Sequence, residues 1–182
     1  MSRHPSLGLP LATYRLRLSL LVLALSVLPS ASHAVEPDPG ALVAIDDQVS
    51  VLCPADMARE QRSLGTRGDM LTLSDGNDVL AVVVYRRDGA DKPPPPAEAL
   101  RVHVDELERA LGPATRAPSK RRVLGRDQNA LTLTLTREGV ARDAWVVATE
   151  SRGMTIVVSA VLIQGSPNEA AFASVLKGIK VQ

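Results

Sequence analysis

The chain has 182 residues with 21 basic and 20 acidic side chains, and its first 34 residues hold three of the arginines and no acidic residue. The 148 residues that follow therefore carry 18 basic and 20 acidic side chains, a net charge of −2, which excludes the basic footprint of a nucleic-acid-binding protein. That length suits a single domain, and its one cysteine excludes an internal disulfide bond.

The first 34 residues have the three regions of a cleavable secretory signal peptide. Three arginines are followed by an apolar run from Leu18 to Leu28. A membrane-spanning helix needs about twice that length, and the small residues Ser32 and Ala34 fit a cleavage site. We expect cleavage near Ala34 and export to the periplasm or beyond it, with an uncleaved membrane anchor as the alternative. Residues 35–41 are then a short lead-in, and residues 42–182 form one domain.

The residues up to 85 predict strands separated by turns. Apolar, β-branched segments run from 41 to 45, 49 to 52, 69 to 73 and 79 to 85. Pro54 ends the second segment, because proline cannot donate to a central ladder. The fourth segment, Val79–Tyr85, is apolar on both faces and therefore needs cover on both sides of its sheet.

Four consecutive prolines, Pro93–Pro96, precede a helix predicted over Ala97–Leu111. We interpret the prolines as a stiff polyproline II connector, with a ligand for a proline-recognising module as the alternative. Gly112 and Pro113 end the helix. Its apolar stripe, at the spacing of helical turns, consists of Leu100, Val104, Leu107 and Leu111.

A basic, proline-containing connector is predicted over Arg116–Arg122, with a strand beginning within residues 121–125. Leucine and threonine then alternate along Ala130–Arg137, which is the period of a strand with one polar face. Ala144–Thr149 and Met154–Ile163 follow after turns that contain glycine. The three strands predict an antiparallel meander.

The segment Ser166–Glu169 predicts the start of a second helix. Ser166 is expected as the N-cap, with Pro167 in the first helical position and Glu169 completing a capping box. The helix should end near Lys177–Lys180. The order of strands, helix, three strands and helix indicates the α+β class, with an antiparallel sheet flanked by helices.

Three features of this order are shared with a known fold. A strand runs into Pro54, a buried strand precedes the first helix, and the strand Gly125–Thr136 follows a glycine and leads the meander. In these respects the chain, over about residues 42–182, resembles the PsbP-like fold of photosystem II extrinsic subunits and of many bacterial proteins. The resemblance implies an α-β-α sandwich and a non-catalytic adaptor or accessory role.

The chain after Ala34 offers one nucleophile–base pair, Cys53 and His103. A neighbouring histidine activates a cysteine by lowering its pKa. Cys53 lies in an apolar segment, where a free cysteine is a small buried hydrophobe, and His103 lies one position off the apolar stripe of its helix. We therefore predict no catalytic residue, and one cysteine with one histidine is too few for a zinc site. No cofactor motif occurs, so no cofactor is expected.

Asp75, Asn77 and Asp78 cluster around Gly76 between two predicted strands. Calcium loops use the same residue types, but the twelve-residue spacing and the terminal glutamate are missing. We interpret the cluster as a β-turn, because aspartate, glycine and asparagine are the residues that turns require.

A basic patch lies between the first predicted helix and the meander. It could bind an acidic partner or anionic lipid headgroups, whereas the alternative is a solvated loop. The patch consists of Arg116, Lys120, Arg121, Arg122 and Arg126.

Two functions of different classes remain open. The first is an exported, non-catalytic accessory or protein-binding module of the bacterial envelope with an unknown protein partner there; the composition, rich in alanine, arginine and proline, is typical of GC-rich bacteria. The second is a hydrolase-type periplasmic enzyme that uses carboxylates such as Asp56, Glu60 or Glu150. Carboxylates gathered in a water-excluded pocket would favour the second.

Overall fold

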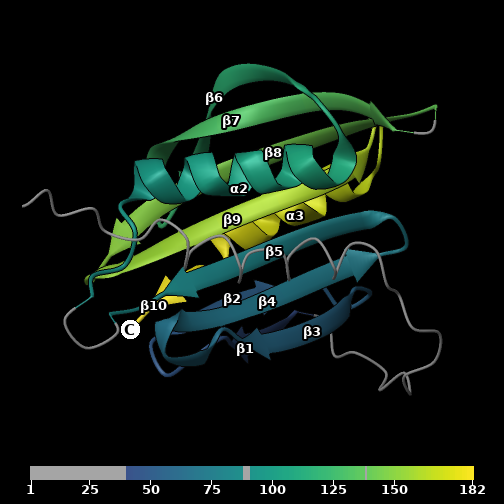
Figure 1. Cartoon of the computed structure of the whole chain (residues 1–182). Helices are drawn as coiled ribbons and strands as arrows, with labels where there is room; N and C mark the ends of the chain where they lie inside the picture. The colour runs from purple at the N-terminus through teal and green to yellow at the C-terminus, as the bar shows by residue number, and fades with distance from the viewer. Residues whose placement is uncertain (1–39, 88–90, 138) are drawn as a thin grey trace, which may run out of the picture.

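Two antiparallel sheets and two α-helices make up the computed structural model (Figure 1), which describes residues 40–87, 91–137 and 139–182. The arrangement confirms the α+β class. The predicted signal peptide, residues 1–34, lies outside the described residues. None of the helices that the structure describes is long and apolar enough to cross a membrane.

The large sheet has seven strands, and every neighbouring pair is antiparallel. The pairing of β5 with β9, with Val82 opposite Val158, joins the N-terminal strands to the C-terminal meander. A short 3-10 turn, Gly65–Arg67, separates β3 from β4. In sheet order the strands are β3 (Ala58–Ser63), β4 (Gly68–Asp75), β5 (Asp78–Tyr85), β9 (Met154–Ile163), β8 (Val140–Ser151), β7 (Arg126–Arg137) and β6 (Thr115–Val123).

The small sheet brings together the two ends of the described chain. Its strands are β1 (Ala41–Ala44), β2 (Val49–Cys53) and β10 (Ile179–Val181), with β2 in the centre. Val51 of β2 lies opposite Val43 on one side and Ile179 on the other.

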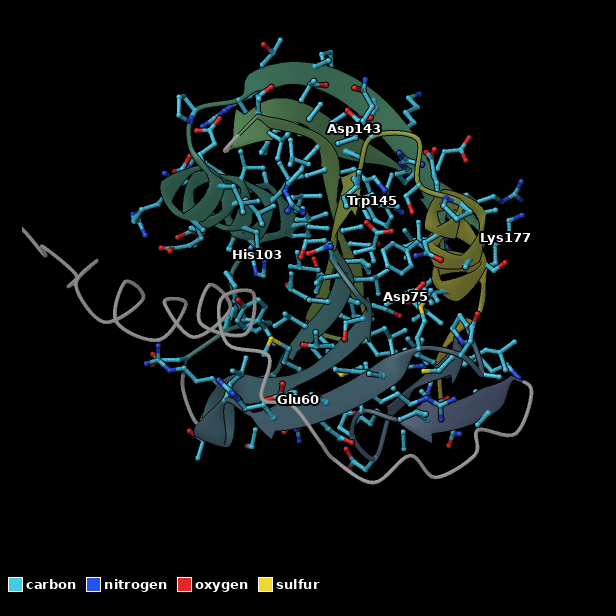
Figure 2. The ribbon with its side chains drawn as sticks, turned by 90° about the vertical axis from the view of Figure 1, so that its right-hand side faces the viewer. Glu60, Asp75, His103, Asp143, Trp145 and Lys177 are labelled. Carbon is cyan, nitrogen blue, oxygen red and sulfur yellow. The ribbon has the colours of Figure 1, made fainter. Side chains whose placement is uncertain are left out.

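The helices lie on opposite faces of the large sheet (Figures 1 and 2). Helix α2 (Pro96–Leu111) packs across β7, β8 and β9, and helix α3 (Asn168–Lys177) packs on the other face against β6 and β9. The small sheet shares the layer of α3, since α3 also contacts β2. The resemblance implied helices alone in both outer layers, and the second layer instead combines a helix with three strands.

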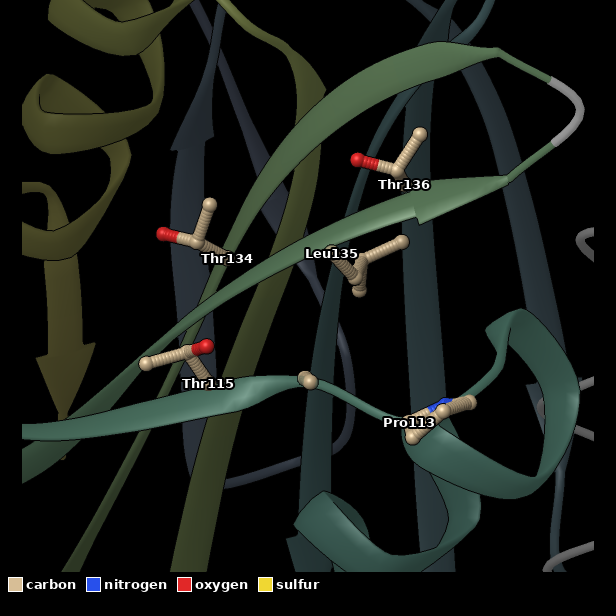
Figure 3. Close-up of a pocket in the computed structure, with 6 residues that line it drawn as sticks. Pro113, Thr115, Thr134, Leu135 and Thr136 are labelled. Atoms are coloured by element: carbon tan, nitrogen blue, oxygen red, sulfur yellow. The ribbon is translucent and has the colours of Figure 1, made fainter.

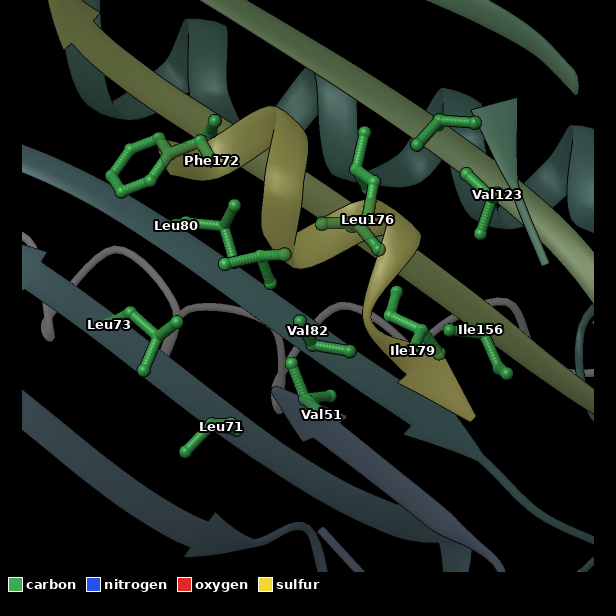
Figure 4. Packing of buried hydrophobic residues seen from close by; sticks show 14 of the residues in the cluster. Val51, Leu71, Leu73, Leu80, Val82, Val123, Ile156, Phe172, Leu176 and Ile179 are labelled. Atoms are coloured by element: carbon green, nitrogen blue, oxygen red, sulfur yellow. The ribbon is translucent and has the colours of Figure 1, made fainter. Parts of the chain in front are cut away.

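Each face of the large sheet carries its own apolar core, as the two apolar faces of β5 require. Leu80 and Val82 belong to the core beneath α3 and the small sheet, together with Phe172 and Leu176 of α3 (Figure 4). Ala81 and Val83 belong instead to the core beneath α2. The residues that alternate along one strand therefore anchor different layers.

The structure contains three strands that were not predicted from the sequence. The predicted basic connector is the edge strand β6, whose proline is tolerated because an edge has no second ladder to complete. The other edge strand, β3, was not predicted, because its sequence Ala-Arg-Glu-Gln-Arg-Ser has no apolar alternation. The second helix ends at Lys177, and Ile179 begins β10 instead of continuing the helix.

Candidate functional site

Cys53 and His103 lie on opposite faces of the large sheet. Cys53 belongs to the core beneath the small sheet, whereas His103 sits on α2, whose other buried residues form the opposite core (Figure 2). Burial raises the pKa of the Cys53 thiol, which favours the unreactive protonated form. The structure therefore does not bring the pair together.

His103 is not the boundary residue that the helix pattern predicted, because its side chain is 1% exposed. Its Nε2 lies 2.9 Å from the hydroxyl of Tyr85, and its Nδ1 has no hydrogen-bond partner among the described residues. Burial lowers the pKa of His103 to about 4, so the imidazole is neutral near pH 7. Tyr85 and His103 form a structural contact between β5 and α2.

The three carboxylates considered for hydrolysis are exposed and come from different parts of the fold. Glu60 lies on β3 and forms an ion pair with Arg62. Glu150 lies on β8, four strands away across the sheet, which corresponds to about 19 Å at the usual strand spacing. The structure does not gather these carboxylates into one pocket.

A shallow groove of about 530 Å³ lies between the connection that follows α2 and the end of β7 (Figure 3). Thr115 and Thr134, which are register partners, contribute hydroxyl groups to its wall. The lining contains no ionisable side chain, so the groove supplies no acid or base from its own walls; it consists of Pro113, Ala114, Thr115, Thr134, Leu135 and Thr136.

Asp75, Asn77 and Asp78 form the predicted turn between β4 and β5. The Asp78 carboxylate is buried and accepts hydrogen bonds from the Ile163 backbone N–H, the Ser166 hydroxyl and the Asn168 side-chain amide. Within the described residues, no group of three or more His, Cys, Asp or Glu side chains could hold a metal ion. The turn fastens the β9–α3 segment to the sheet.

The capping box predicted for α3 is not formed. Ser166 accepts a hydrogen bond from the Asn168 N–H, at 3.1 Å, but lies one residue before the N-cap position, and its hydroxyl is shared with Asp78. Glu169 extends towards Arg121 at 3.8 Å instead of folding back on the helix start. Glu169 therefore interacts with Arg121, which is distant in the sequence, instead of with the backbone at the start of α3.

The basic patch divides between the two faces of β6. Arg116 forms hydrogen-bonded ion pairs with Glu108 and Asp105 of α2. The hydrogen bond between Arg116 and Glu108 lowers the pKa of Glu108 and raises that of Arg116. Arg121 points to the other face, where its guanidinium lies 4.8 Å from the centre of the Trp145 ring.

Three members of the patch remain exposed without an ion-pair partner among the described residues. They are Lys120 and Arg122 on β6 and Arg126 at the start of β7. Lys120 and Arg122 share one face of the strand because side chains alternate. Arg116 and Arg121 thus contact other parts of the fold, whereas these three exposed cations have no ion-pair partner among the described residues.

A second hollow, of about 210 Å³, lies beside Arg121 and was not predicted from the sequence. Trp145 and Asp143 of β8 line it together with Glu169. No motif in the sequence marks Trp145 as a site residue. Trp145 and Arg121 come together only through the pairing of three strands. Arg121 of β6 lies opposite Gln128 of β7, and Thr132 of the same strand β7 lies opposite Trp145 of β8.

Comparison with protein-family models gives no match, and comparison with curated proteins gives none either. The PsbP-like resemblance therefore stays a prediction.

Several solved structures are similar to this chain at low sequence identity. One, from Bacteroides thetaiotaomicron, has a TM-score of 0.48 and 12% identity over 74% of this chain, which spans 45% of that protein. LpqN of Mycobacterium tuberculosis, which is involved in cell envelope biogenesis, has a TM-score of 0.47 and 18% identity over 80% of this chain and 86% of its own. Protein PA94 of Pseudomonas aeruginosa, a protein of unknown function, has a TM-score of 0.39 and 14% identity over 75% of this chain and 93% of its own. At these values the similarity assigns no role to this chain.

Proposed function

We propose that the chain is an exported, non-catalytic binding module of the bacterial envelope, and that an acidic, extended segment of a partner protein pairs with the outer edge of β6. The N-terminal pattern of a signal peptide supports export, with cleavage near Ala34. The observation that carries the binding role is the pair of exposed cations on one face of the edge strand β6, Lys120 and Arg122, which have no ion-pair partner among the described residues. Arg126, at the start of β7, adds a third positive charge beside them.

The geometry of β6 supports strand addition. Within the described sheet, β6 pairs with β7 on one side and with no strand on the other. Its nine residues span about 30 Å, long enough for a partner strand of ordinary length. Extended peptides bind such edges through main-chain hydrogen bonds, and side chains add specificity.

The charge of the edge selects the partner. Lys120, Arg122 and Arg126 repel a second copy of the same edge, and Pro118 removes one backbone donor. A segment with glutamate or aspartate at alternate positions would place its carboxylates beside Lys120 and Arg122, which share one face of β6. The edge therefore discourages self-association and still attracts an acidic strand.

A peptide titration tests this proposal. The probe is a fluorescently labelled peptide that alternates glutamate and valine, and its match is a peptide of the same length that alternates lysine and valine. Fluorescence anisotropy should show binding of the acidic peptide alone, and the affinity should fall as salt rises, because exposed charges are screened.

Charge variants of the full chain locate the binding edge. The combined change Lys120→Glu, Arg122→Glu and Arg126→Glu should weaken binding of the acidic peptide at least tenfold. The matched control is Arg59→Glu with Arg62→Glu on the opposite edge strand β3, which should leave the affinity within twofold. If the triple variant fails to fold by circular dichroism, glutamine replaces glutamate at the same positions.

Three outcomes would overturn the proposal. Binding of both peptides alike would remove the charge selection, and equal losses in both sets of variants would remove the role of β6. Binding to vesicles of anionic lipid without binding to the acidic peptide would assign the cations to a membrane surface.

A further inference from the structure

The 210 Å³ hollow beside Arg121 lies on the face of the large sheet that carries α3, away from Lys120 and Arg122. Figure 2 shows Asp143 and Trp145 on the side of α3. The polar side chains that line the hollow come from β6, β7, β8 and the start of α3, and they are Arg121, Thr132, Asp143, Trp145, Ser166 and Glu169.

Two buried N–H groups of this hollow have no acceptor. Trp145 is 2% exposed, and its indole Nε1 has no hydrogen-bond partner within the described structure. The Nε of Arg121 is buried and equally without a partner, and the Glu169 carboxylate reaches the same guanidinium at a long 3.8 Å. A buried donor without an acceptor is unfavourable, so two donors in one small space indicate a missing acceptor group.

The donor types define that acceptor. The indole and the guanidinium can donate hydrogen bonds and cannot accept them. A guanidinium presents its donors in a planar fork that matches the two oxygens of a carboxylate. The other hydroxyls of the hollow already have partners, because Thr132 donates to Ser119 and Ser166 is held by Asp78.

The acidic side chains of the hollow set the overall charge of its occupant. Asp143 and Glu169 together carry two negative charges, and Arg121 carries one positive charge. A simple anion would therefore meet net repulsion, whereas an occupant with its own ammonium group would be neutral and could place that group near the two carboxylates.

We propose that this hollow binds a small zwitterion, a free α-amino acid with a short side chain. The carboxylate of the amino acid accepts from Arg121 and Trp145, and its ammonium group faces Asp143 and Glu169. The volume is below the range of about 300–1,000 Å³ that drug-sized ligands use, so glycine, alanine or serine fits and a large side chain does not.

Trp145 is the one tryptophan of the chain, so its indole signal reports directly on the hollow. In ¹H–¹⁵N spectra of the ¹⁵N-labelled protein lacking residues 1–34, glycine or alanine should move the indole cross-peak downfield and saturate with a Kd on the order of 1 mM. Acetate and methylamine, which each supply half of the zwitterion, should bind at least tenfold more weakly. Free tryptophan should leave the cross-peak unchanged.

Two variants and one control separate a binding site from a structural contact. Arg121→Lys and Asp143→Asn should each weaken glycine binding at least tenfold, and either alone suffices if the other fails to fold. The control Arg122→Lys lies on the same strand but on its other face and should leave glycine binding unchanged.

The proposal is overturned if glycine and alanine leave the indole cross-peak in place, because the two donors would then be satisfied by water. It is also overturned if acetate or inorganic phosphate binds as tightly as glycine, which would make the site a general anion site. Neither result bears on the acidic-peptide proposal, which rests on the outer edge of β6 and on Lys120 and Arg122, whose side chains lie on the other face from Arg121.

Discussion

A neutral histidine in an apolar core makes stability depend on pH. The pKa of His103 is about 4 in the folded chain and near 6.5 when unfolded, because burial disfavours the charged imidazole. Between these values the unfolded chain binds more protons than the folded chain. The contribution of the neutral His103 to the free energy of unfolding is therefore complete above pH 6.5. It is lost as the pH drops towards 4, and the total loss is about 3 kcal/mol.

Urea unfolding at several pH values between 7 and 4 checks this prediction. The variant His103→Gln keeps a polar group for Tyr85 but has no proton to gain. Its free energy of unfolding should lose the part of the pH dependence that belongs to His103. Parallel curves for the two proteins would assign the pH dependence to other groups.

The sequence could not show that His103 is buried. Its position beside the apolar stripe of α2 is compatible with a boundary site, and only the packing of Tyr85 from β5 covers the ring with a hydrogen-bonding partner. The burial of Cys53 was easier to predict, because this residue lies within an apolar strand, and it is fully buried as predicted. Burial can therefore be predicted more safely for a residue within an apolar segment than for a polar residue beside one.

At the scale of elements, Asp78 fastens two segments that are far apart in the chain. It takes three hydrogen bonds from the β9–α3 segment, including 2.8 Å to the Ile163 N–H and 2.9 Å to the Asn168 amide. The variant Asp78→Ala would leave these donors without their acceptor and should cost about 3 kcal/mol of unfolding free energy.

The neighbouring Asp75 provides the matched control. It is exposed and shares the Asn168 amide with Asp78, so Asp75→Ala should change the unfolding free energy by no more than about 0.5 kcal/mol. Chemical denaturation of both variants measures the difference. Equal effects would mean that the turn, and not the carboxylate of Asp78, holds the segment.

Interior strands were predictable and edge strands were not. Val79–Tyr85 is apolar throughout, and Met154–Ile163 is apolar except for Thr155 and Ser159. Both are central strands of the large sheet. The edge strands β3 and β6 have polar and basic residues at most positions, because one side of each faces solvent and charged residues discourage unwanted pairing. The feature that supports the proposed binding role is therefore the same one that hid β6 in the sequence.

For the whole molecule, the class and the placement of the two helices among the strands followed from the sequence, whereas three of the strands and the layers did not. The patterns of α2 and of the meander predicted helices against an antiparallel sheet. The separate small sheet depends on Ile179–Val181 returning to β2, a contact between residues about 130 positions apart that no local pattern specifies. The hollow at Trp145 could not be predicted for the same reason, since its walls come from β6, β7, β8, β9 and α3.

Removal of residues 179–182 tests how much the small sheet contributes to stability. Ile179 is 4% exposed, and the Gln182 N–H donates to the Gln48 carbonyl at 2.9 Å. Their loss should lower the unfolding free energy by about 3 kcal/mol or more, because a large apolar side chain leaves the core and β2 loses one of its two neighbours.

The exposed Lys180 of the same strand serves as the control, and Lys180→Ala should change the unfolding free energy by about 0.5 kcal/mol or less. Urea titrations of the three proteins give the comparison. An unchanged urea midpoint in the shortened chain would show that β10 contributes little.

The pairing of β10 with β2 also sets the order of events during synthesis. Strand β2 is synthesised about 130 residues before β10, the neighbour that it needs on one side. Until β10 has been synthesised, the apolar core beneath the small sheet lacks part of its cover, so the complete native packing of this layer waits for a contact between distant residues.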